Sequence, residues 1–592
     1  MKRTVVALTI AGLCLVAGVA LWRYHRVEHH QFAAAQLVPA ETLLLADFPD
    51  LPATAIRWRE TALFQIFNEP QVQAFLARPI AKLQEKQASS RLAQIQPQRA
   101  FLAVVSVTNS MPRAVGGVAF GGDRAEMEKL LARARAKAQN ASPNGRLERL
   151  SYRKFQIETF SDGGITVAGC FAKNWYFVAN DVDLLKTTLD RLTGKTLTAL
   201  ATAPSYLQSQ SVLPSFPDFR LFTQPGVLSD RLVARLNATG RMIDPQESAA
   251  LRKIRAVALA TRLEGRRIRD TLFLYHPGTP PRPELNGKTL ALTTPNTLFY
   301  AAMAPQISDE VPQRGDPQAV PGIIPMRTLL AALNSPPATL LQFKAAFGPE
   351  HAVLLDWPCD VAQPSLFLAS EIRDPAEARR FMETVFHAWS RADSEGISFW
   401  TLTMDDPTMA QFHPTVALTA HHMLAGLSPE SLRPFASNAA HSPAVGITLE
   451  KSAAFQGSMA SLPKPQTGLA YLDAKPLFEH IYSWIRPAAM LWGNGIAGLG
   501  RVVDFSKMPT TSVIAEHLSP IALSARQTDS GTVMESTGPV SFLELGAGFG
   551  AATLAVAMPA IRENPRIPGK GRPRIVPSHP TTPLSAPAPN LR

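Results

Sequence analysis

The hydrophobic pattern of the chain begins with an unbroken apolar run. Residues 4–22 carry no charged side chain and directly follow Met1-Lys2-Arg3. About 20 apolar residues in a helix match a hydrocarbon core of ~30 Å, so the run predicts a membrane-spanning helix. It ends in Trp22 and Tyr24, and such aromatic residues are typical of the membrane–water interface. The pattern favours an uncleaved signal-anchor over residues 1–30, and a cleaved signal peptide stays as the alternative.

Beyond this run, strand and helix periodicities alternate. Phe101–Val107 and Ile165–Gly169 are rich in β-branched residues and bounded by turn residues, so they predict strands. Ala125–Lys137 repeats its apolar positions every three or four residues and predicts an amphipathic helix. Strand pairs with helices inserted between them indicate an α+β fold of antiparallel sheets with packed helices.

The chain also matches itself, with a period near 250–260 residues. Each match is short, but the matches keep the same order, so we interpret them as two copies of one α+β unit. The matched segments are Pro39–Leu45 with Pro295–Tyr300, Thr166–Ala168 with Thr415–Ala417, Trp175–Asn180 with Met423–Gly426, Asp183–Leu189 with Glu430–Ala436, Phe219–Phe222 with Leu469–Leu472, and Ala256–Arg262 with Pro520–Arg526.

These patterns divide the chain into six predicted parts. A Pro- and Gly-rich stretch separates the two copies, and such composition is typical of a linker. The parts are an anchor at 1–30, a first α+β repeat at 36–276, a linker at 277–287, a second α+β repeat at 288–544, an apolar helix at 545–561, and a basic, Pro-rich tail at 562–592 that we expect to be disordered.

The apolar helix near the C-terminus has two interpretations. Residues 545–561 are uncharged and are followed by a basic tail, which fits a second membrane span with a cytoplasmic end. The run is short and rich in Gly and Ala, which fits a helix packed on the second repeat equally. Both interpretations stay open.

Composition narrows the function classes. The chain has 592 residues, of which 46% are hydrophobic and 18% charged, so it is globular and long enough for two or more domains. Its net charge is +12, but residues 1–30 carry +3 and residues 562–592 carry +5. The remaining +4 is spread over more than 500 residues, which argues against nucleic-acid binding by the folded part.

Three cysteines give no sign of metal or redox chemistry. Cys14 lies in the apolar run, and Cys170 and Cys359 are far apart without a CxxC partner. Cys170 and Cys359 either are two buried apolar residues or, in an oxidising compartment, form one disulfide.

Several glycine motifs resemble nucleotide-binding loops. Phe542–Gly550 is similar to the glycine loop of methyltransferases that use S-adenosylmethionine, but only 42 residues follow it, too few to complete the required sheet. Gly493–Gly498 follows a helix-like stretch, Phe478–Trp492, and precedes the strand-like Arg501–Phe505, the reverse of the dinucleotide fingerprint. Gly194–Thr196 and Gly287–Thr289 lack the upstream glycine of a P-loop. We therefore expect no cofactor.

The sequence gives equally weak evidence for catalytic nucleophiles and for metal ligands. Ser151 with Lys154, and Ser461 with Lys464, have the spacing of serine–lysine acyl enzymes, which chance supplies in a long chain. We assign no catalytic residue.

Histidines occur in two small groups. Residues 25–30 hold three histidines beside Glu28, which we read as a polar collar next to the membrane. His421 and His422 fall in a predicted strand, where neighbours face opposite sides and cannot share a metal. We assign no metal site.

The start of the exported part resembles a known group of proteins. Leu37–Pro52, Trp58–Phe64 and Glu69–Phe75 resemble the opening pattern of an uncharacterised bacterial family of membrane-anchored proteins of unknown function, best over residues 37–80. The resemblance implies an exported α+β domain and supplies no catalytic residue.

Together these observations predict a non-enzymatic, single-pass protein of the inner (cytoplasmic) membrane, with its bulk on the periplasmic side. Its expected partners are membrane lipid at the N-terminal helix and other envelope proteins, which makes it a scaffold or a partner-binding protein. The alternative is a binder of apolar or lipid-like ligands in a cleft between the repeats, and a hydrolase ranks third. Filled cores with an exposed apolar patch would favour the first function, and a large apolar cavity the second.

Overall fold

The computed structural model describes residues 33–84, 94–107, 112–195, 197–227, 252–305, 338–358, 361, 363–403, 413–440, 448–495 and 503–546. The chain forms two compact units, residues 1–543 and residues 544–592. The predicted anchor at 1–30, the tail at 562–592 and nearly all of the apolar run at 545–561 lie outside the described residues. Within the described residues, no helix is both long and apolar enough to cross a membrane.

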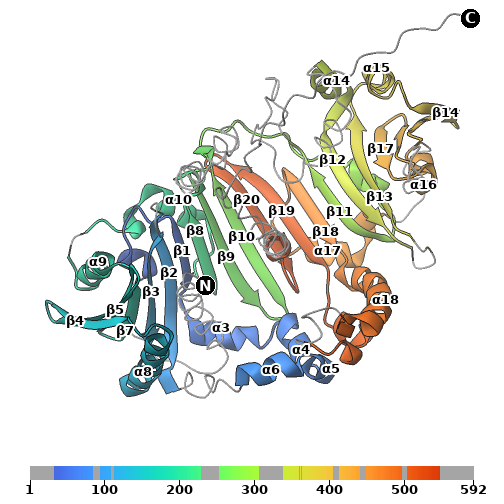
Figure 1. Ribbon diagram of the computed structural model, residues 1–592. Coiled ribbons are helices and arrows are strands. Elements are labelled where there is room, and N and C mark those ends of the chain that lie inside the picture. The colour runs from blue at the N-terminus through green and yellow to red at the C-terminus, as the bar shows by residue number, and fades with distance from the viewer. Residues whose placement is uncertain are drawn as a thin grey trace, which may run out of the picture. The chain divides into compact units, whose positions relative to one another are not determined.

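The described strands of the first unit join edge to edge in one antiparallel sheet (Figure 1). From one edge to the centre, the order is β4 (Arg146–Tyr152), β5 (Phe155–Asp162), β6 (Ile165–Ala172), β7 (Trp175–Ala179), β3 (Pro112–Phe120), β2 (Pro97–Val107), β1 (Leu44–Phe48), β8 (Phe219–Thr223), β9 (Ala256–Glu264) and β10 (Arg267–Tyr275).

The sheet then continues to its other edge. From the centre outwards, the order is β20 (Gly531–Gly538), β19 (Ile521–Thr528), β18 (Gly468–Leu472), β11 (Thr297–Met303), β12 (Phe347–Asp356), β13 (Ser365–Ile372), β17 (His422–Gly426), β16 (Thr415–Leu418), β15 (Ile397–Thr401) and β14 (Ser390–Ser394).

The two halves of the sheet have the same strand order. Read from the centre, β10, β9, β8 and β1 correspond to β20, β19, β18 and β11, and the correspondence continues to the two edges. The halves meet at the β10–β20 pair, in register from Ile268↔Gly538 to Tyr275↔Gly531. The strands matched in sequence therefore hold equivalent places, for example β6 with β16 and β8 with β18.

The predicted linker at 277–287 is bound to the second half. The backbone N–H of Arg282 donates to Oε1 of Gln527 at 2.8 Å, and that of Leu285 donates to the carbonyl of Gln466 at 2.7 Å. The two predicted repeats thus share one sheet and one compact unit, while the domain boundaries given above stay predictions.

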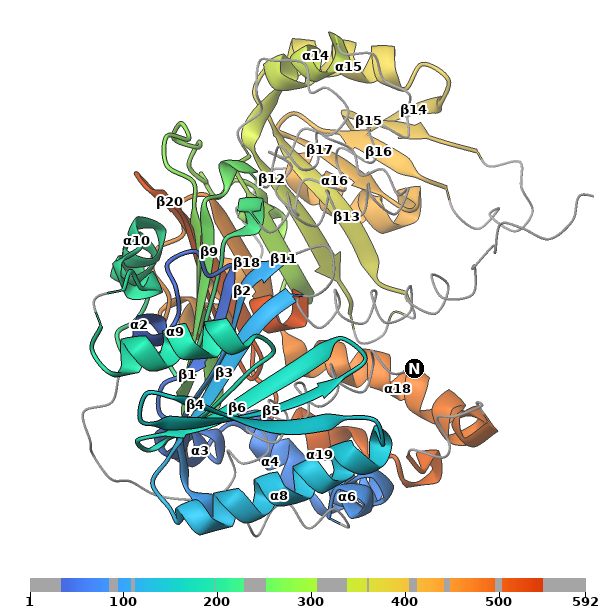
Figure 2. The same ribbon diagram turned by 60° about the vertical axis from the view of Figure 1, so that its left-hand side comes forward.

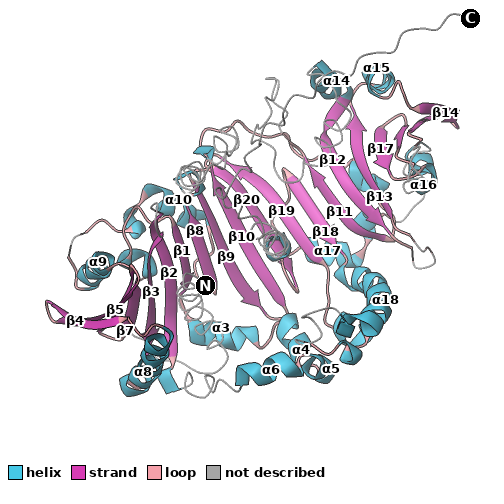
Figure 3. Cartoon of the chain, in the orientation of Figure 1, coloured by secondary structure: helices cyan, strands magenta, loops and turns pink. Residues whose placement is uncertain are grey.

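Helices fill the connections between the strands (Figure 3). In the first half they are α2 (Ala34–Leu37), α3 (Leu51–Trp58), α4 (Ala62–Asn68), α5 (Pro70–Phe75), α6 (Ala77–Gln84), α8 (Arg124–Ala141), α9 (Val182–Leu192) and α10 (Pro204–Val212), with the 3₁₀ turn η1 (Leu200–Thr202). In the second half they are α14 (Ala338–Ala346), α15 (Pro375–Val385), α16 (Pro429–Ala440), α17 (Ala453–Met459), α18 (Ala474–Trp492) and α19 (Thr511–Ala515), with η2 (Thr289–Leu292), η3 (Leu449–Lys451), η4 (Gly493–Gly495) and η5 (Phe505–Lys507).

Helix starts follow from local chemistry. Asp123 caps α8 by accepting from the N–H of Ala125, and Asp374 caps α15 by accepting from the N–H groups of Ala376 and Glu377. A carboxylate at this position satisfies otherwise unpaired donors and the helix dipole. The helix predicted at 125–137 is confirmed as part of α8, and the predicted strands at 101–107 and 165–169 lie in β2 and β6.

Two local predictions are wrong. Arg501–Phe505 was expected to be strand-like, and of this stretch only residues 503–505 are described; they form no strand, and Phe505 begins the 3₁₀ turn η5, because the side chain of Asp504 accepts from the N–H of Ser506. His421 was expected inside a strand together with His422. Strand β17 begins only at His422, because Thr419 and His422 close a turn in which His421 lies.

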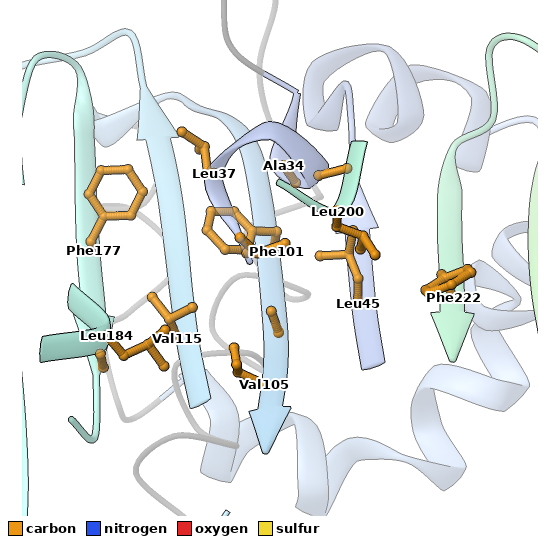
Figure 4. Close-up of a cluster of buried hydrophobic side chains, with 14 of the residues drawn as sticks. Ala34, Leu37, Leu45, Phe101, Val105, Val115, Phe177, Leu184, Leu200 and Phe222 are labelled. Atoms are coloured by element: carbon orange, nitrogen blue, oxygen red, sulfur yellow. The ribbon is translucent and has the colours of Figure 1, made fainter. Parts of the chain in front are cut away.

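Helices pack against both faces of each half of the sheet, while one face of β9 and β10 stays half-buried. In the first half, α9 packs Leu184 and Leu189 with Phe101 and Phe177 on one face, part of which Figure 4 shows. Helix α8 packs on the opposite face with Phe120 (Figure 2). In the second half, α16 and α15 belong to separate apolar clusters on opposite faces. The sheet faces under these helices are therefore filled by side chains.

The β10–β20 junction allows a stability test. A Cβ on Gly531 would lie 2.0 Å from the backbone carbonyl oxygen of Leu274, so Gly531→Ala must displace one of the two central strands. We expect it to lower the free energy of unfolding by about 1–3 kcal/mol, measured by chemical denaturation. The control is Gly457→Ala in α17, where a Cβ meets nothing within 4 Å, and it should be neutral or stabilising by about 0.5–1 kcal/mol. Equal effects of the two variants would contradict the β10–β20 pairing.

Candidate interaction surface on helix α18

Helix α18 runs from Ala474 to Trp492 in the connection between β18 and β19. Its apolar residues recur three or four positions apart at Ile481, Trp484, Ile485, Ala488, Leu491 and Trp492. This spacing places them on one side of a helix. Such a side normally faces a core, yet no residue of α18 is buried.

The large side chains of this side face solvent. The exposed fractions are 42% for Ile481, 60% for Trp484, 53% for Ile485, 75% for Leu491 and 71% for Trp492. We call these five residues the α18 stripe. They form a run of adjoining exposed apolar groups, and such patches on folded proteins mark contact with a protein or a membrane.

Arg486 and Tyr482 of α18 are turned towards the body. Arg486 donates from Nε to the carbonyl oxygen of Pro509 at 2.9 Å, and the hydroxyl of Tyr482 donates to the same oxygen at 2.9 Å. These contacts bind α18 to the segment before α19, so the α18 stripe has a fixed orientation.

A second set of contacts supports the middle of the helix. The indole of Trp357, which follows β12, stacks on the ring of His480 with centroids 4.6 Å apart. It also meets the edge of Trp484 at 5.9 Å, and its Nε1 donates to the carbonyl of Val361 at 3.0 Å. Trp484 of the α18 stripe is thus in contact with the body through Trp357.

Residues of the first half also contact the segment that supports α18. Gln71 accepts a hydrogen bond from the N–H of Thr510 at 2.8 Å. Glu69 and His517 lie 2.6 Å apart between Oε1 and Nε2. Both glutamine and glutamate belong to the segment that carries the family resemblance. Helix α5 therefore rests on the η5–α19 segment that supports α18, so residues from both halves position the helix.

A buried polar cluster lies where β12 begins and β13 ends. Glu350 is fully buried. Its Oε2 accepts from the N–H groups of Asn286 (2.8 Å) and Gly287 (2.7 Å), and its Oε1 accepts from the N–H (2.8 Å) and hydroxyl (2.6 Å) of Thr289. Glu371 forms an ion pair with Lys288. The carboxylates thus fasten the end of the predicted linker to the second half.

This cluster distinguishes the two halves. In the first half, Trp175 at the start of β7 lies opposite Ala119. At the equivalent place in the second half, His422 at the start of β17 lies opposite Glu371. His422 is 8% exposed, and neither of its ring nitrogens makes a hydrogen bond of normal geometry in the described part of the chain.

His351, on the other face of β12, gives the chain an expected acid sensitivity. Burial lowers the pKa of His351 from 6.5 to about 4, against an opposing effect of Glu371. Because the unfolded chain takes up this proton near pH 6.5 and the folded chain only near pH 4, stability falls as the pH drops through that window. The expected loss from this group is about 3 kcal/mol.

This prediction is tested by measuring the free energy of unfolding between pH 7 and pH 4 for the parent chain and for His351→Gln. The variant should lose stability less steeply, because glutamine does not titrate. His387→Gln, at an exposed position on the turn after α15, is the control and should leave the slope unchanged. A parent-like slope in His351→Gln would contradict the prediction.

The serine of each serine–lysine pair makes a hydrogen bond to another residue. The hydroxyl of Ser151 lies 3.3 Å from Oε1 of Gln156, and the ammonium of Lys154 lies 5.7 Å from the ring centroid of Phe155. The hydroxyl of Ser461 donates to the carbonyl of Ser458 at 2.8 Å.

The glycine motifs lie at turns and helix ends. Gly194 follows α9 with a φ of +86°, and Gly287 has a φ of +75° beside Glu350. Gly493 follows α18 directly. Phe542–Gly546 is helical, and the rest of that motif lies outside the described residues.

Cysteine and metal predictions are only partly accessible. Cys170 is a buried free thiol, and burial raises its pKa to about 11. Cys14, Cys359 and the histidines of residues 25–30 lie outside the described residues. Over the described ranges, no group of three or more His, Cys, Asp and Glu side chains is arranged to hold a metal ion.

Comparisons with known proteins identify no family. No family model matches the chain, and no curated protein matches it. Among solved structures, crystal form I of TP0453 is 10% identical, with a TM-score of 0.23, and covers 42% of this chain and 81% of that one. Crystal form III is 11% identical, with a TM-score of 0.24, and covers 43% and 83%. Scores this low carry no argument, and the resemblance to the uncharacterised bacterial family stays a prediction.

Proposed function

We propose that the chain is a membrane-anchored, exported, non-enzymatic protein that uses helix α18 to bind a partner. The observation that carries this proposal is the α18 stripe. It exposes two tryptophans and three aliphatic side chains on a helix whose arginine and tyrosine are fixed to the body. Filled sheet faces together with an exposed apolar patch are what a scaffold or partner-binding protein requires.

The proposal includes an internal duplication. The equal strand order of the two halves and the short matches in sequence support it. A duplicated unit retains the positions that its fold needs, while other positions diverge. Trp484 and Trp492 lie in the connection between β18 and β19. The corresponding connection of the first half, residues 224–255, contains no tryptophan. We therefore assign partner binding to the second half.

Labelling in native membranes tests this function. Single Trp492→Cys and Phe216→Cys variants are made in a full chain carrying Cys14→Ser and Cys359→Ser. Cys170 can stay, because a buried thiol with a raised pKa reacts slowly. A membrane-impermeant maleimide is added before and after detergent extraction.

We expect position 492 to react slowly in membranes and quickly in detergent. Phe216, 87% exposed in the loop between α10 and β8, should react at the same rate in both. Fast labelling of position 492 in intact membranes would overturn the proposal, because the α18 stripe would then have no partner.

One observation favours the second candidate function, binding of an apolar ligand between the repeats. Across the junction, Leu272 pairs with Leu259 on one side and Met534 on the other, and all three side chains are only half-buried. A charged side chain introduced into this row should prevent an apolar ligand from binding there. Met534→Lys would then abolish the binding of a fluorescent fatty acid, whereas Leu207→Lys on α10 would retain it. Equal binding by both variants would eliminate this candidate.

A further inference from the structure

We infer that the partner of the α18 stripe is the lipid bilayer itself, with α18 lying along the interface between headgroups and acyl chains. This inference rests on the proposed function and specifies its partner. A second protein is the competing occupant, and the experiment below separates the two.

The chemistry of the α18 stripe fits an interface better than a protein groove. Two of its five side chains are tryptophans, and tryptophan is enriched at the boundary between headgroups and acyl chains. Ala488 lies on the same side of the helix, and none of the exposed positions of α18 from Ile481 to Trp492 is charged. A helix with such a face and polar groups behind it lies in the plane of the membrane.

Arg486 is the charged residue of α18 between Ile481 and Trp492, and it is placed where a bilayer would tolerate it. Arg486 and Tyr482 bond to Pro509 on the protein side of the helix. His480 is stacked on Trp357. Immersion of the stripe therefore removes no charged side chain of this segment from water, which avoids the main cost of placing a helix in lipid.

The predicted membrane span lies only a short stretch of chain before the described residues. The predicted span ends at Trp22, and Ala33 is the first described residue. The ten residues between them reach at most about 33–36 Å when fully extended. A body tethered this closely meets the membrane surface at a high effective concentration, so even a weak interfacial helix would be occupied.

The C-terminal end of the first unit also bears on the position of α18. The ring of Phe542 lies 6.4 Å from that of Phe299 in β11, with an edge-to-face geometry. The N–H of Asp473, which precedes α18, donates to the carbonyl of Leu298 in the same strand at 2.7 Å. The chain thus leaves this unit beside the start of α18, two residues before the uncharged run at 545–561.

Nitroxide labelling measures whether lipid is the partner. Trp484→Cys, Trp492→Cys and Phe216→Cys are labelled singly in the full chain with Cys14→Ser and Cys359→Ser. The chain is reconstituted in vesicles of phosphatidylcholine and phosphatidylglycerol without any other protein. Power saturation then compares collisions with oxygen, which partitions into lipid, and with a water-soluble nickel chelate. A thermal melt of each labelled chain confirms that it is folded.

We expect positions 484 and 492 to be more accessible to oxygen and less accessible to nickel than position 216. Nickel accessibility equal to that of position 216 would overturn the lipid assignment. If position 492 is nevertheless protected from maleimide in native membranes, the partner is a protein, and the proposed function stands while this inference fails. Exposure in both experiments would refute both.

Discussion

Replacing Glu350 with alanine should destabilise the protein by at least about 3 kcal/mol, among the largest effects expected of any single substitution in the second half. The side chain is fully buried and accepts four hydrogen bonds, three from the backbone of residues 286–289 and one from the hydroxyl of Thr289. Alanine would leave the N–H and the hydroxyl of the buried Thr289 unpaired, at a cost of about 1–3 kcal/mol for each group, and would also remove the acceptor of the partly buried N–H groups of Asn286 and Gly287. Chemical denaturation of the parent and the variant measures the difference.

Glu383→Ala is the matched control. Glu383 lies on α15 with a half-exposed side chain paired to Arg391 at 3.2 Å, and exposed ion pairs contribute less than about 1 kcal/mol. A loss of stability in Glu350→Ala no larger than in the control would mean that the linker is not fastened through Glu350. Segment 277–287 would then act as a free connection between the halves.

The second large effect concerns binding and not stability. The double variant Trp484→Ser and Trp492→Ser should melt like the parent, because both indoles face solvent for most of their surface. It should nevertheless lose its partner, since the two largest groups of the α18 stripe are gone. The readout is maleimide labelling of a reporter at Leu491→Cys in native membranes. Labelling should be slow in the parent background and as fast as in detergent in the double variant.

Exposed apolar residues elsewhere provide the control. Leu207→Ser with Phe216→Ser removes a comparable amount of exposed apolar surface from α10 and the loop after it. Protection of the reporter should be unchanged in that variant. If both double variants release the reporter equally, the effect comes from removing exposed apolar side chains anywhere on the protein, and α18 has no special role. If neither does, the α18 stripe does not hold the partner.

The sequence could predict the repeating elements but not how the halves meet. Thr166–Ala168 and Thr415–Ala417 were matched from sequence, and they lie in the equivalent strands β6 and β16. The pairing of β10 with β20 joins backbone groups, and backbone hydrogen bonds leave little trace in side-chain pattern. For the same reason, the Pro- and Gly-rich composition of residues 277–287 did not show that backbone N–H groups of this segment donate hydrogen bonds to Glu350 and Gln527.

The candidate surface was visible in the sequence only as a helix. Phe478–Trp492 predicted the helix that the structure describes as α18. Helical periodicity is the same whether an apolar side is buried or exposed, so exposure of the α18 stripe required the structure. The cluster around Glu350 was missed because its members are far apart in sequence, at Asn286, Glu371 and His422. The presence of two acidic residues within apolar strand segments was the one available signal.

Photocrosslinking from position 485 tests most directly the central claim that α18 carries the partner-binding surface. A photoreactive amino acid replaces Ile485 in the full chain, and the chain is irradiated in its native membranes. A chain with the same group at Glu383 serves as the reference. We predict adducts from position 485, to lipid if the further inference holds, and none above background from position 383. Adducts from neither position, or equally from both, would contradict the claim.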